Sequence, residues 1–183
     1  IEWGHNVEII NLRPDKSTNQ NFKSKLRKYF LNREFNLFRD RELPPISDEY
    51  SCVDSLNKNY PSADLYIVGS DQVWNPQITK KNLMAYFFSF LNDEKRIAYA
   101  ASFGVDSWDW EIDEVKINLS KFSNLGIREG SGVDLCKTTF GINSVKVIDP
   151  TLLLENYDKL LSNQRQLNVD VATYKFLKDE KWY

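Results

Sequence analysis

The sequence predicts an α/β fold, with a Rossmann-like, mainly parallel sheet and helices on both faces. Short apolar runs at residues 65–68, 97–101, 125–127 and 145–148 have the length of buried strands. The segments between them carry apolar residues at helical spacing and are long enough for the crossovers that join parallel strands. Several of these runs end in glycine or small polar residues, as is typical of the carboxyl edge of an open α/β sheet.

The chain is organised around residues 64–75, which read Asp-Leu-Tyr-Ile-Val-Gly-Ser-Asp-Gln-Val-Trp-Asn. A buried strand stops at Gly69, and three hydrogen-bonding side chains follow it: Ser70, Asp71 and Gln72. Ligands of open α/β sheets bind in the crevice at such strand ends. Two interpretations stay open here, a ligand-binding loop or a surface turn with Trp74 in the core.

Upstream of this stretch, we expect the end of a helix at residues 1–5, with Gly4 as a left-handed cap. Residues 7–12 alternate and are rich in β-branched side chains, which predicts a strand. Residues 22–38 carry the apolar stripe of an amphipathic helix, and residues 48–57 predict a shorter helix. The only histidine, His5, is interpreted as a capping or packing residue rather than a catalyst.

Downstream, residues 109–122 predict a helix, and a second helix is expected from Ser131, a good N-cap, to Phe140. A short helix near residues 156–161 and one more strand within 168–176 complete the prediction. Four residues are expected near the carboxyl ends of their strands, along one edge of the sheet: Val68, Ala101, Ile127 and Ile148.

Composition narrows the class of protein. The chain has 183 residues, of which 42% are hydrophobic and 27% charged, as in ordinary globular proteins. A net charge of −2 argues against nucleic-acid binding, and no apolar stretch reaches membrane-spanning length. Cys52 and Cys136 are expected to be reduced thiols of a cytoplasmic protein. Neither metal-type spacing nor a Walker or Gly-x-Gly-x-x-Gly loop occurs, so we expect no metal, nicotinamide or nucleoside-triphosphate cofactor.

Polar side chains follow three of the predicted strands. They form the candidate binding site, which comprises Ser70, Asp71, Gln72, Ser102, Arg128, Ser131 and Gly132. Arg128 supplies a planar fork suited to phosphate or carboxylate, and the amides of a helix start favour an anion. The alternative is that Arg128 pairs with an acid such as Glu129 or Asp71 while Ser131 merely caps. Anion binding is the favoured interpretation.

Four segments then resemble one known family. Their order and spacing are similar to those of the polysaccharide pyruvyl transferases, and they span residues 67–76, 98–104, 127–132 and 149–154. The resemblance covers nearly the whole chain. Gly130 departs from the family pattern, because a lysine or similar polar residue is common there. The family's first strand and nearly all of its second domain are also expected to be missing, so we take the chain as a piece of a longer protein.

The resemblance implies two Rossmann-like domains that face each other across a cleft, similar to GT-B glycosyltransferases. Residues 1–165 would form the amino-terminal domain without its first strand, and residues 166–183 a linker and the start of the second. The implied reaction moves pyruvate from phosphoenolpyruvate onto sugar hydroxyls as a ketal, during synthesis of exopolysaccharide for the bacterial cell envelope. The implied partners are phosphoenolpyruvate and a saccharide or lipid-linked saccharide, and a homo-oligomer is a further expectation.

The resemblance also places most catalytic groups in the second domain, including a histidine that His5 does not match. We therefore expect this chain alone to be inactive. Two alternatives stay open: a GT-B-type glycosyltransferase that uses a nucleotide-sugar, and a non-catalytic glycan-binding or assembly domain.

Overall fold

The structure is a computed structural model that describes residues 4–13 and 33–154. The chain divides into two units, Ile1–Pro150 and Thr151–Tyr183. Of the second unit the structure describes only residues 151–154, most of which belong to the short 3-10 helix η2 (Pro150–Leu153). The fold and the site below belong to the first unit.

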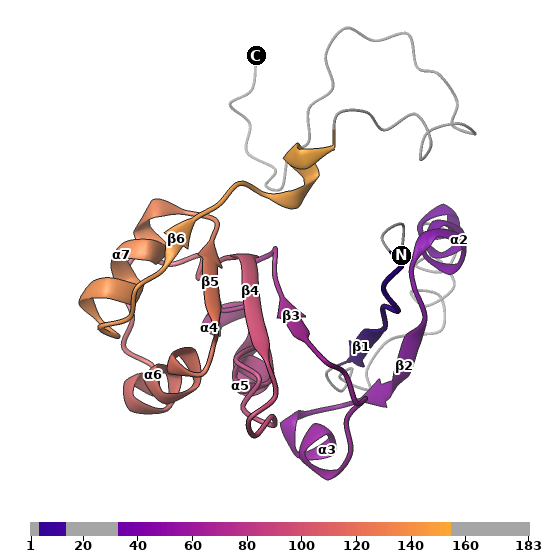
Figure 1. The fold of residues 1–183 in the computed structure, drawn as a ribbon, viewed down its shortest axis with the longest axis horizontal. Coiled ribbons are helices and arrows are strands. Elements are labelled where there is room, and N and C mark those ends of the chain that lie inside the picture. Colours follow the sequence, from indigo (N-terminus) through magenta and orange to yellow (C-terminus); the bar gives the residue numbers. More distant parts are fainter. Residues whose placement is uncertain (1–3, 14–32, 155–183) are drawn as a thin grey trace, which may run out of the picture. The chain divides into compact units, whose positions relative to one another are not determined.

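A four-stranded sheet forms the centre of the first unit (Figure 1). Its strands lie in the order β3 (Tyr66–Val68), β4 (Arg96–Ala101), β5 (Asn124–Ile127) and β6 (Val145–Lys146). All three strand pairs are parallel, which confirms the predicted parallel sheet.

The predicted strand ends agree at three of four positions. Val68, Ala101 and Ile127 are the last residues of β3, β4 and β5. The fourth prediction, Ile148, is wrong by two residues, because β6 ends at Lys146. One more ladder bond follows, from the amide of Val147 to the carbonyl of Ile127 at 2.8 Å. The chain then turns away before Pro150, which has no amide hydrogen to continue a ladder.

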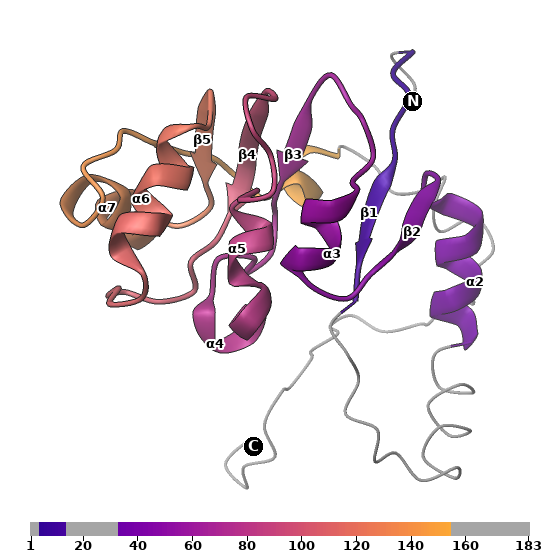
Figure 2. The same ribbon diagram turned by 90° about the horizontal axis from the view of Figure 1, so that it is seen from below.

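Helices connect these strands in sequence order. Between β3 and β4 lie α4 (Pro76–Thr79), the 3-10 helix η1 (Lys80–Asn82) and α5 (Leu83–Tyr86). Helix α6 (Ile112–Ser120) joins β4 to β5, and α7 (Gly130–Thr138) joins β5 to β6. Because each strand neighbours the next and such crossovers are right-handed, these helices gather on one face of the sheet. Figure 2 shows α5 and α6 on the same side of the strands.

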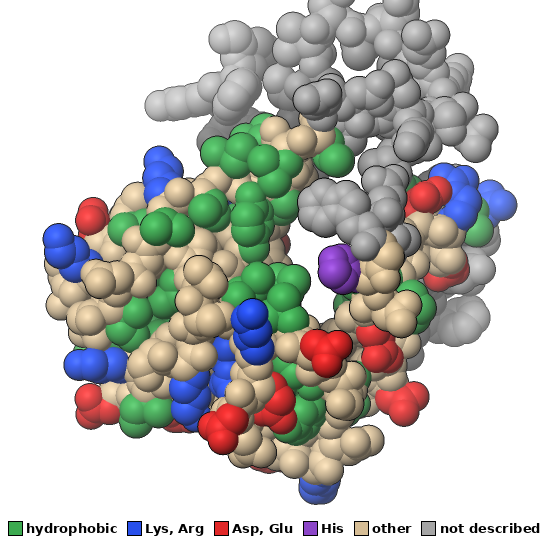
Figure 3. Space-filling view, viewed as in Figure 1, with side chains coloured by type: hydrophobic (Ala, Val, Ile, Leu, Met, Phe, Trp, Pro, Cys, Tyr) green, Lys and Arg blue, Asp and Glu red, His purple; other side chains and the backbone are tan. Residues whose placement is uncertain are grey.

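The opposite face of the four-stranded sheet is apolar and open within the described part of the chain. Ile67 on β3 is 61% exposed and Val145 on β6 is 62% exposed, whereas Tyr66 and Val68 are buried. Figure 3 looks onto this face and shows hydrophobic side chains at its surface. Helices on both faces were predicted, and among the described residues they cover one face of this sheet.

Two further strands form a sheet of their own. Strands β1 (Ile9–Leu12) and β2 (Ile46–Tyr50) run parallel, and the chain between them includes α2 (Arg33–Glu42). Strand β1 confirms the strand predicted over residues 7–12, although it begins two residues later. Helix α2 overlaps the end of the helix predicted over residues 22–38, whose first part lies outside the described residues.

The helix predicted over residues 48–57 is wrong in its first half. That half belongs to β2, and a helix, α3 (Val53–Lys58), follows it. Pairing with β1 keeps the first half extended: Glu49 lies opposite Asn11, and Tyr50 opposite Leu12. Strand formation depends more on such cross-strand neighbours than on local propensity, which is why the local pattern misled the prediction.

Aromatic rings fill the space between the four-stranded sheet and its helices. Trp74 is fully buried and stacks on Phe87 with ring centroids 4.9 Å apart. It also packs against Phe103 at 5.1 Å, and its indole nitrogen donates to the carbonyl of Tyr86 at 2.8 Å. Trp74 is therefore a core residue, and its burial ties the loop after β3 to the helical layer.

Several smaller predictions can also be placed. Gly4 has a φ of +81°, as expected for a left-handed residue, and His5 is exposed (the purple side chain in Figure 3). Cys52 and Cys136 are both free thiols, as predicted. The helix end at residues 1–3, the helix near 156–161 and the strand within 168–176 lie outside the described residues. No helix in the described ranges is both long and apolar enough to cross a membrane.

Candidate functional site

The carboxyl ends of β3, β4 and β5 are joined by backbone hydrogen bonds between the segments that follow them. The amide of Ser102 donates to the carbonyl of Asp71 at 3.2 Å, and the amide of Trp74 donates to the carbonyl of Ser102 at 3.1 Å. The amide of Arg128 donates to the carbonyl of Ala101 at 3.1 Å. The sequence therefore brings the three predicted strand ends together as one surface, at the edge where open α/β sheets bind ligands.

Arg128 stands at the centre of this edge. Its Nη1 donates to the carbonyl of Ser70 at 2.8 Å and lies 3.5 Å from Oδ2 of Asp149. The side chain is 32% exposed, and within residues 4–13 and 33–154 its Nε and Nη2 have no hydrogen-bond partner. Its acidic partner is thus Asp149, and neither Glu129 nor Asp71 takes that place. Two of its three nitrogens remain able to bind a planar anion.

A second arginine in the same sheet shows the contrast. Arg96, at the start of β4, is fully buried, and its guanidinium nitrogens donate hydrogen bonds to main-chain carbonyls. Nη1 bonds Phe88 at 3.0 Å and Nη2 bonds Asn92 at 2.6 Å, while Nε lies 3.3 Å from its acceptor. Arg96 therefore supports the fold, whereas the half-buried fork of Arg128 has capacity left for a ligand.

Glycine permits the close approach of the segments at two positions. Gly69 has a φ of +153°, and a Cβ there would lie 1.8 Å from the carbonyl oxygen of Tyr99. Gly104 has a φ of +61°, and a Cβ there would lie 2.2 Å from Oε1 of Gln72. A side chain at Gly69 would push the segment after β3 away from the backbone of β4, and one at Gly104 would be strained by its φ and would displace the Gln72 side chain. The two glycines thus set the spacing on which the edge depends.

Helix α7 begins beside Arg128, and its N-cap lies two residues earlier than predicted. Its N-cap is Glu129 rather than Ser131, and the Glu129 side chain makes no capping bond. The carboxylate accepts hydrogen bonds from the amides of Phe103 at 2.8 Å and Gly104 at 3.4 Å instead. An N-cap side chain normally accepts from the second or third amide of its helix, here Ser131 or Gly132. Neither of these amides donates to an acceptor within the described ranges.

The remaining predicted site residues lie in the same loops with different exposures. Asp71 is exposed, and its Oδ1 accepts from the amide of Gln72 at 2.7 Å. Gln72 is half-buried, and its Oε1 accepts from Nδ2 of Asn75 at 2.7 Å. Ser102 is only 2% exposed. Asp71 is therefore the exposed side chain of this group, Gln72 is half-buried as Arg128 is, and Ser102 lies beneath the surface and joins the loops through its backbone.

Comparison with known protein families identifies the family of this chain. The family model for polysaccharide pyruvyl transferase matches residues 3–183. The chain belongs to this family. No curated protein and no solved structure matches the chain.

Sequence reasoning missed three residues that hold this pyruvyl transferase edge together: Asn75, Glu129 and Asp149. Asn75 is the N-cap of α4 and accepts from the amide of Gln77 at 2.9 Å. An asparagine before a proline at a helix start is a recognisable N-cap signal, so this role could have been found. The bonds of Glu129 span 25 and 26 residues, and the contact of Asp149 with Arg128 spans 21. No local signal encodes such contacts.

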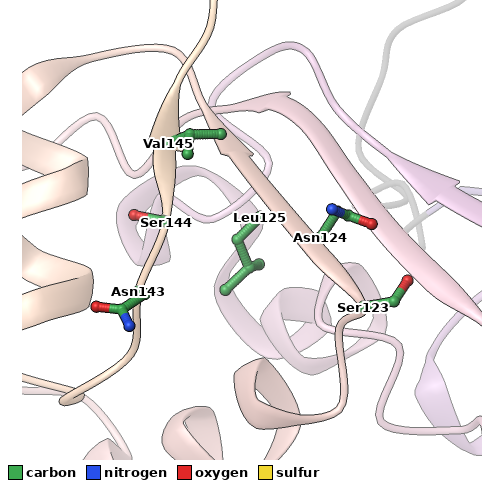
Figure 4. Close-up of a pocket in the computed structure, with 6 residues that line it drawn as sticks. All are labelled: Ser123, Asn124, Leu125, Asn143, Ser144 and Val145. Atoms are coloured by element: carbon green, nitrogen blue, oxygen red, sulfur yellow. The ribbon is translucent and has the colours of Figure 1, made fainter.

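Other features of this family member lie away from the carboxyl ends of the strands. A pocket of about 190 Å³ lies at the amino ends of β5 and β6, and its polar side chains do not converge on one point (Figure 4). Among the described residues, no three His, Cys, Asp or Glu side chains are grouped so that they could hold a metal ion. Burial raises the pKa of Cys136 on α7 to about 11, so this thiol is not a nucleophile at neutral pH.

Proposed function

We propose that this chain supplies the donor-binding half of an enzyme that transfers pyruvate from phosphoenolpyruvate to sugar hydroxyls. Membership of the polysaccharide pyruvyl transferase family supports the reaction class and a saccharide acceptor. One observation carries the donor assignment: two nitrogens of the Arg128 guanidinium have no partner among the described residues, and they lie beside a helix start without a side-chain cap. The proposed acceptor is a saccharide or lipid-linked saccharide of a cell-surface polysaccharide.

Phosphoenolpyruvate carries a phosphate and a carboxylate, and the proposed site offers a matching donor for each. Nε and Nη2 of Arg128 can form a bidentate pair with one group. The amides at the start of α7, together with the positive end of its dipole, suit the other. Asp71 is exposed at the same edge and could accept from a sugar hydroxyl, which makes it the described residue we assign to the acceptor side.

The proposed reaction has four bond changes at the enol carbons of phosphoenolpyruvate. A proton is added to the methylene carbon of phosphoenolpyruvate, which leaves a cationic centre at the neighbouring carbon. A sugar hydroxyl oxygen bonds to that carbon and gives up its proton, and the bond from carbon to the phosphate oxygen breaks to release phosphate. A second hydroxyl of the same sugar then bonds to that carbon through its oxygen and gives up its proton, which completes the ketal. We assign no described residue as the proton donor. We also propose that residues 1–183 alone do not catalyse transfer.

Calorimetric titration of the purified chain with phosphoenolpyruvate, a nucleotide-sugar and a glycan tests the donor assignment. Binding of phosphoenolpyruvate alone, or in preference to the nucleotide-sugar, supports it. Preference for the nucleotide-sugar would instead indicate a glycosyltransferase, and glycan binding without either donor would indicate a non-catalytic domain.

The transfer step needs a separate assay. Phosphate release is measured with phosphoenolpyruvate and a panel of sugar acceptors, using this chain and a longer protein that contains it. Acceptor-dependent release by the longer protein supports the proposed reaction. Equal release by residues 1–183 would overturn the part of the proposal that calls this chain inactive alone.

A further inference from the structure

Glu129 is the described acid nearest in sequence to Arg128. Because the proposed reaction needs a proton donor, Glu129 could serve either as that donor or as a residue that positions the site. Successive residues of an extended strand point to opposite faces, and the two side chains do diverge after β5. Arg128 reaches Ser70 and Asp149, whereas Glu129 reaches the backbone of Phe103 and Gly104.

We propose that Glu129 is a positioning residue, which holds the segment after β4 in place and leaves the start of α7 open to the donor anion. The inference rests on the proposed function for the identity of that anion. Its geometric basis is independent of it, namely the two amides that bond one carboxylate oxygen, Oε1.

Contacts through Gly104 connect Glu129 to the loop after β3. Gly104, which donates to Glu129, packs so closely that a Cβ on it would lie 2.2 Å from Oε1 of Gln72 and 2.8 Å from Nδ2 of Asn75. Nδ2 of Asn75 also lies 3.5 Å from the carbonyl oxygen of Gly104. A displacement of Gly104 would therefore disturb the side chains of Gln72 and Asn75, which belong to the loop whose Ser70 carbonyl holds Arg128.

The same bonds explain why α7 has no side-chain cap. A carboxylate at the N-cap would normally bond the amides of its own helix and compete with any ligand there. In this protein the carboxylate is engaged by Phe103 and Gly104, so the amides of Ser131 and Gly132 have no side-chain acceptor. Gly132 fixes the arrangement, because a Cβ on it would lie 3.0 Å from Oε1 of Glu129 and 2.7 Å from Ile127.

Glutamine separates this role from acid catalysis, because its carbonyl oxygen still accepts from both amides but cannot donate a proton as a carboxylic acid does. In the full chain, Glu129→Gln should keep the affinity for phosphoenolpyruvate within about twofold of the wild type. Glu129→Ala should weaken it at least about fivefold, since both charge-assisted bonds are lost. Asp134→Asn, an exposed site on the same helix, is the control for loss of one charge and should bind as the wild type does.

Hydrogen exchange without ligand supplies the second readout. The amides of Phe103 and Gly104 should be protected in the wild type and in Glu129→Gln, and should exchange faster in Glu129→Ala. If Glu129→Gln binds phosphoenolpyruvate as weakly as Glu129→Ala does, the negative charge of Glu129 matters rather than its hydrogen bonds to the two amides, and the inference is overturned. Unchanged exchange at both amides in Glu129→Ala would overturn it as well. If the wild type binds no phosphoenolpyruvate, the proposed function fails, while the exchange data still decide whether Glu129 holds the segment.

Discussion

Nη1 of Arg128 donates to the main-chain oxygen of Ser70 at 2.8 Å, across a separation of 58 residues in the chain. The same nitrogen lies 3.5 Å from Oδ2 of Asp149, so one donor group contacts the segments that follow β3 and β6. This arrangement uses one end of the guanidinium for the fold, and the other end is the part that we propose binds the donor anion. A fork of this kind is pre-organised, because its plane is already fixed before the anion arrives.

Replacing Arg128 should weaken binding of phosphoenolpyruvate by this chain. Loss of hydrogen bonds to a charged group costs about 1.5–3 kcal/mol, so Arg128→Ala should raise the dissociation constant roughly ten- to a hundredfold. Arg128→Lys should recover only part of the affinity, because an ammonium can bond the Ser70 carbonyl but offers no planar fork. Calorimetric titration measures both variants.

Lys116→Ala is the control for Arg128, because it removes one positive charge from an exposed position on α6. It should bind phosphoenolpyruvate as the wild type does. Equal affinity of Arg128→Ala and the wild type would remove Arg128 from the proposed site.

Gly69→Ala should destabilise the protein through the contact between the segment after β3 and strand β4. The added Cβ would meet the carbonyl oxygen of Tyr99 at 1.8 Å, and a φ of +153° is itself unfavourable for alanine. The variant should lose about 2–4 kcal/mol of unfolding free energy, which lowers Tm by at least about 5 °C in a chain of this size. Thermal unfolding followed by circular dichroism measures the shift.

Gly130→Ala is the matched control for Gly69. It makes the same chemical change at the first residue of α7, where nothing lies within 4 Å of the added Cβ. Alanine favours a helix over glycine, so Tm should stay the same or rise slightly. A Gly69→Ala protein as stable as Gly130→Ala would show that the β3 segment can move away from Tyr99 at little cost.

The strands of the larger sheet could be predicted from sequence because their apolar runs are short, buried and bounded by glycine or polar residues. Strand β2 could not, since its residues 46–50 are mostly exposed and take their conformation from pairing with β1. The start of α7 was misplaced for a related reason. Serine is locally the better N-cap, but the N-cap is Glu129, whose carboxylate bonds the distant amides of Phe103 and Gly104.

The candidate site, too, could be predicted from the sequence only in part. The sequence predicted which segments meet, because parallel strands present their carboxyl ends at one edge. It could not predict that Arg128 takes Asp149 as its acidic partner, or that Glu129 bonds to the segment after β4, because both choices depend on tertiary distances. The local pattern therefore predicted which segments meet at the candidate site, and tertiary packing decides the contacts of its charged groups.

Stability should fall as the pH rises from about 9 to about 11, in part because of Cys136. Burial raises the pKa of this thiol from 9.0 to about 11. A group whose pKa is higher in the folded state stabilises the protein fully below its unfolded pKa, and this stabilisation is lost as pH rises through the folded value. Two pKa units correspond to about 2–3 kcal/mol. Urea unfolding at several pH values, from about pH 8.5 to about pH 10.5, measures the slope.

Cys136→Ser should flatten that slope, because serine does not ionise in this range, even if the substitution lowers stability at every pH. Burial also raises the pKa values of Tyr50, Tyr66 and Tyr86, but these groups are the same in both proteins and cancel in the comparison. Cys52→Ser is the control, since hydrogen bonds from Ser55 and Ser51 lower the pKa of Cys52 and its removal cannot flatten the slope. An unchanged slope in Cys136→Ser would mean that the thiol ionises in the folded protein as readily as in the unfolded chain.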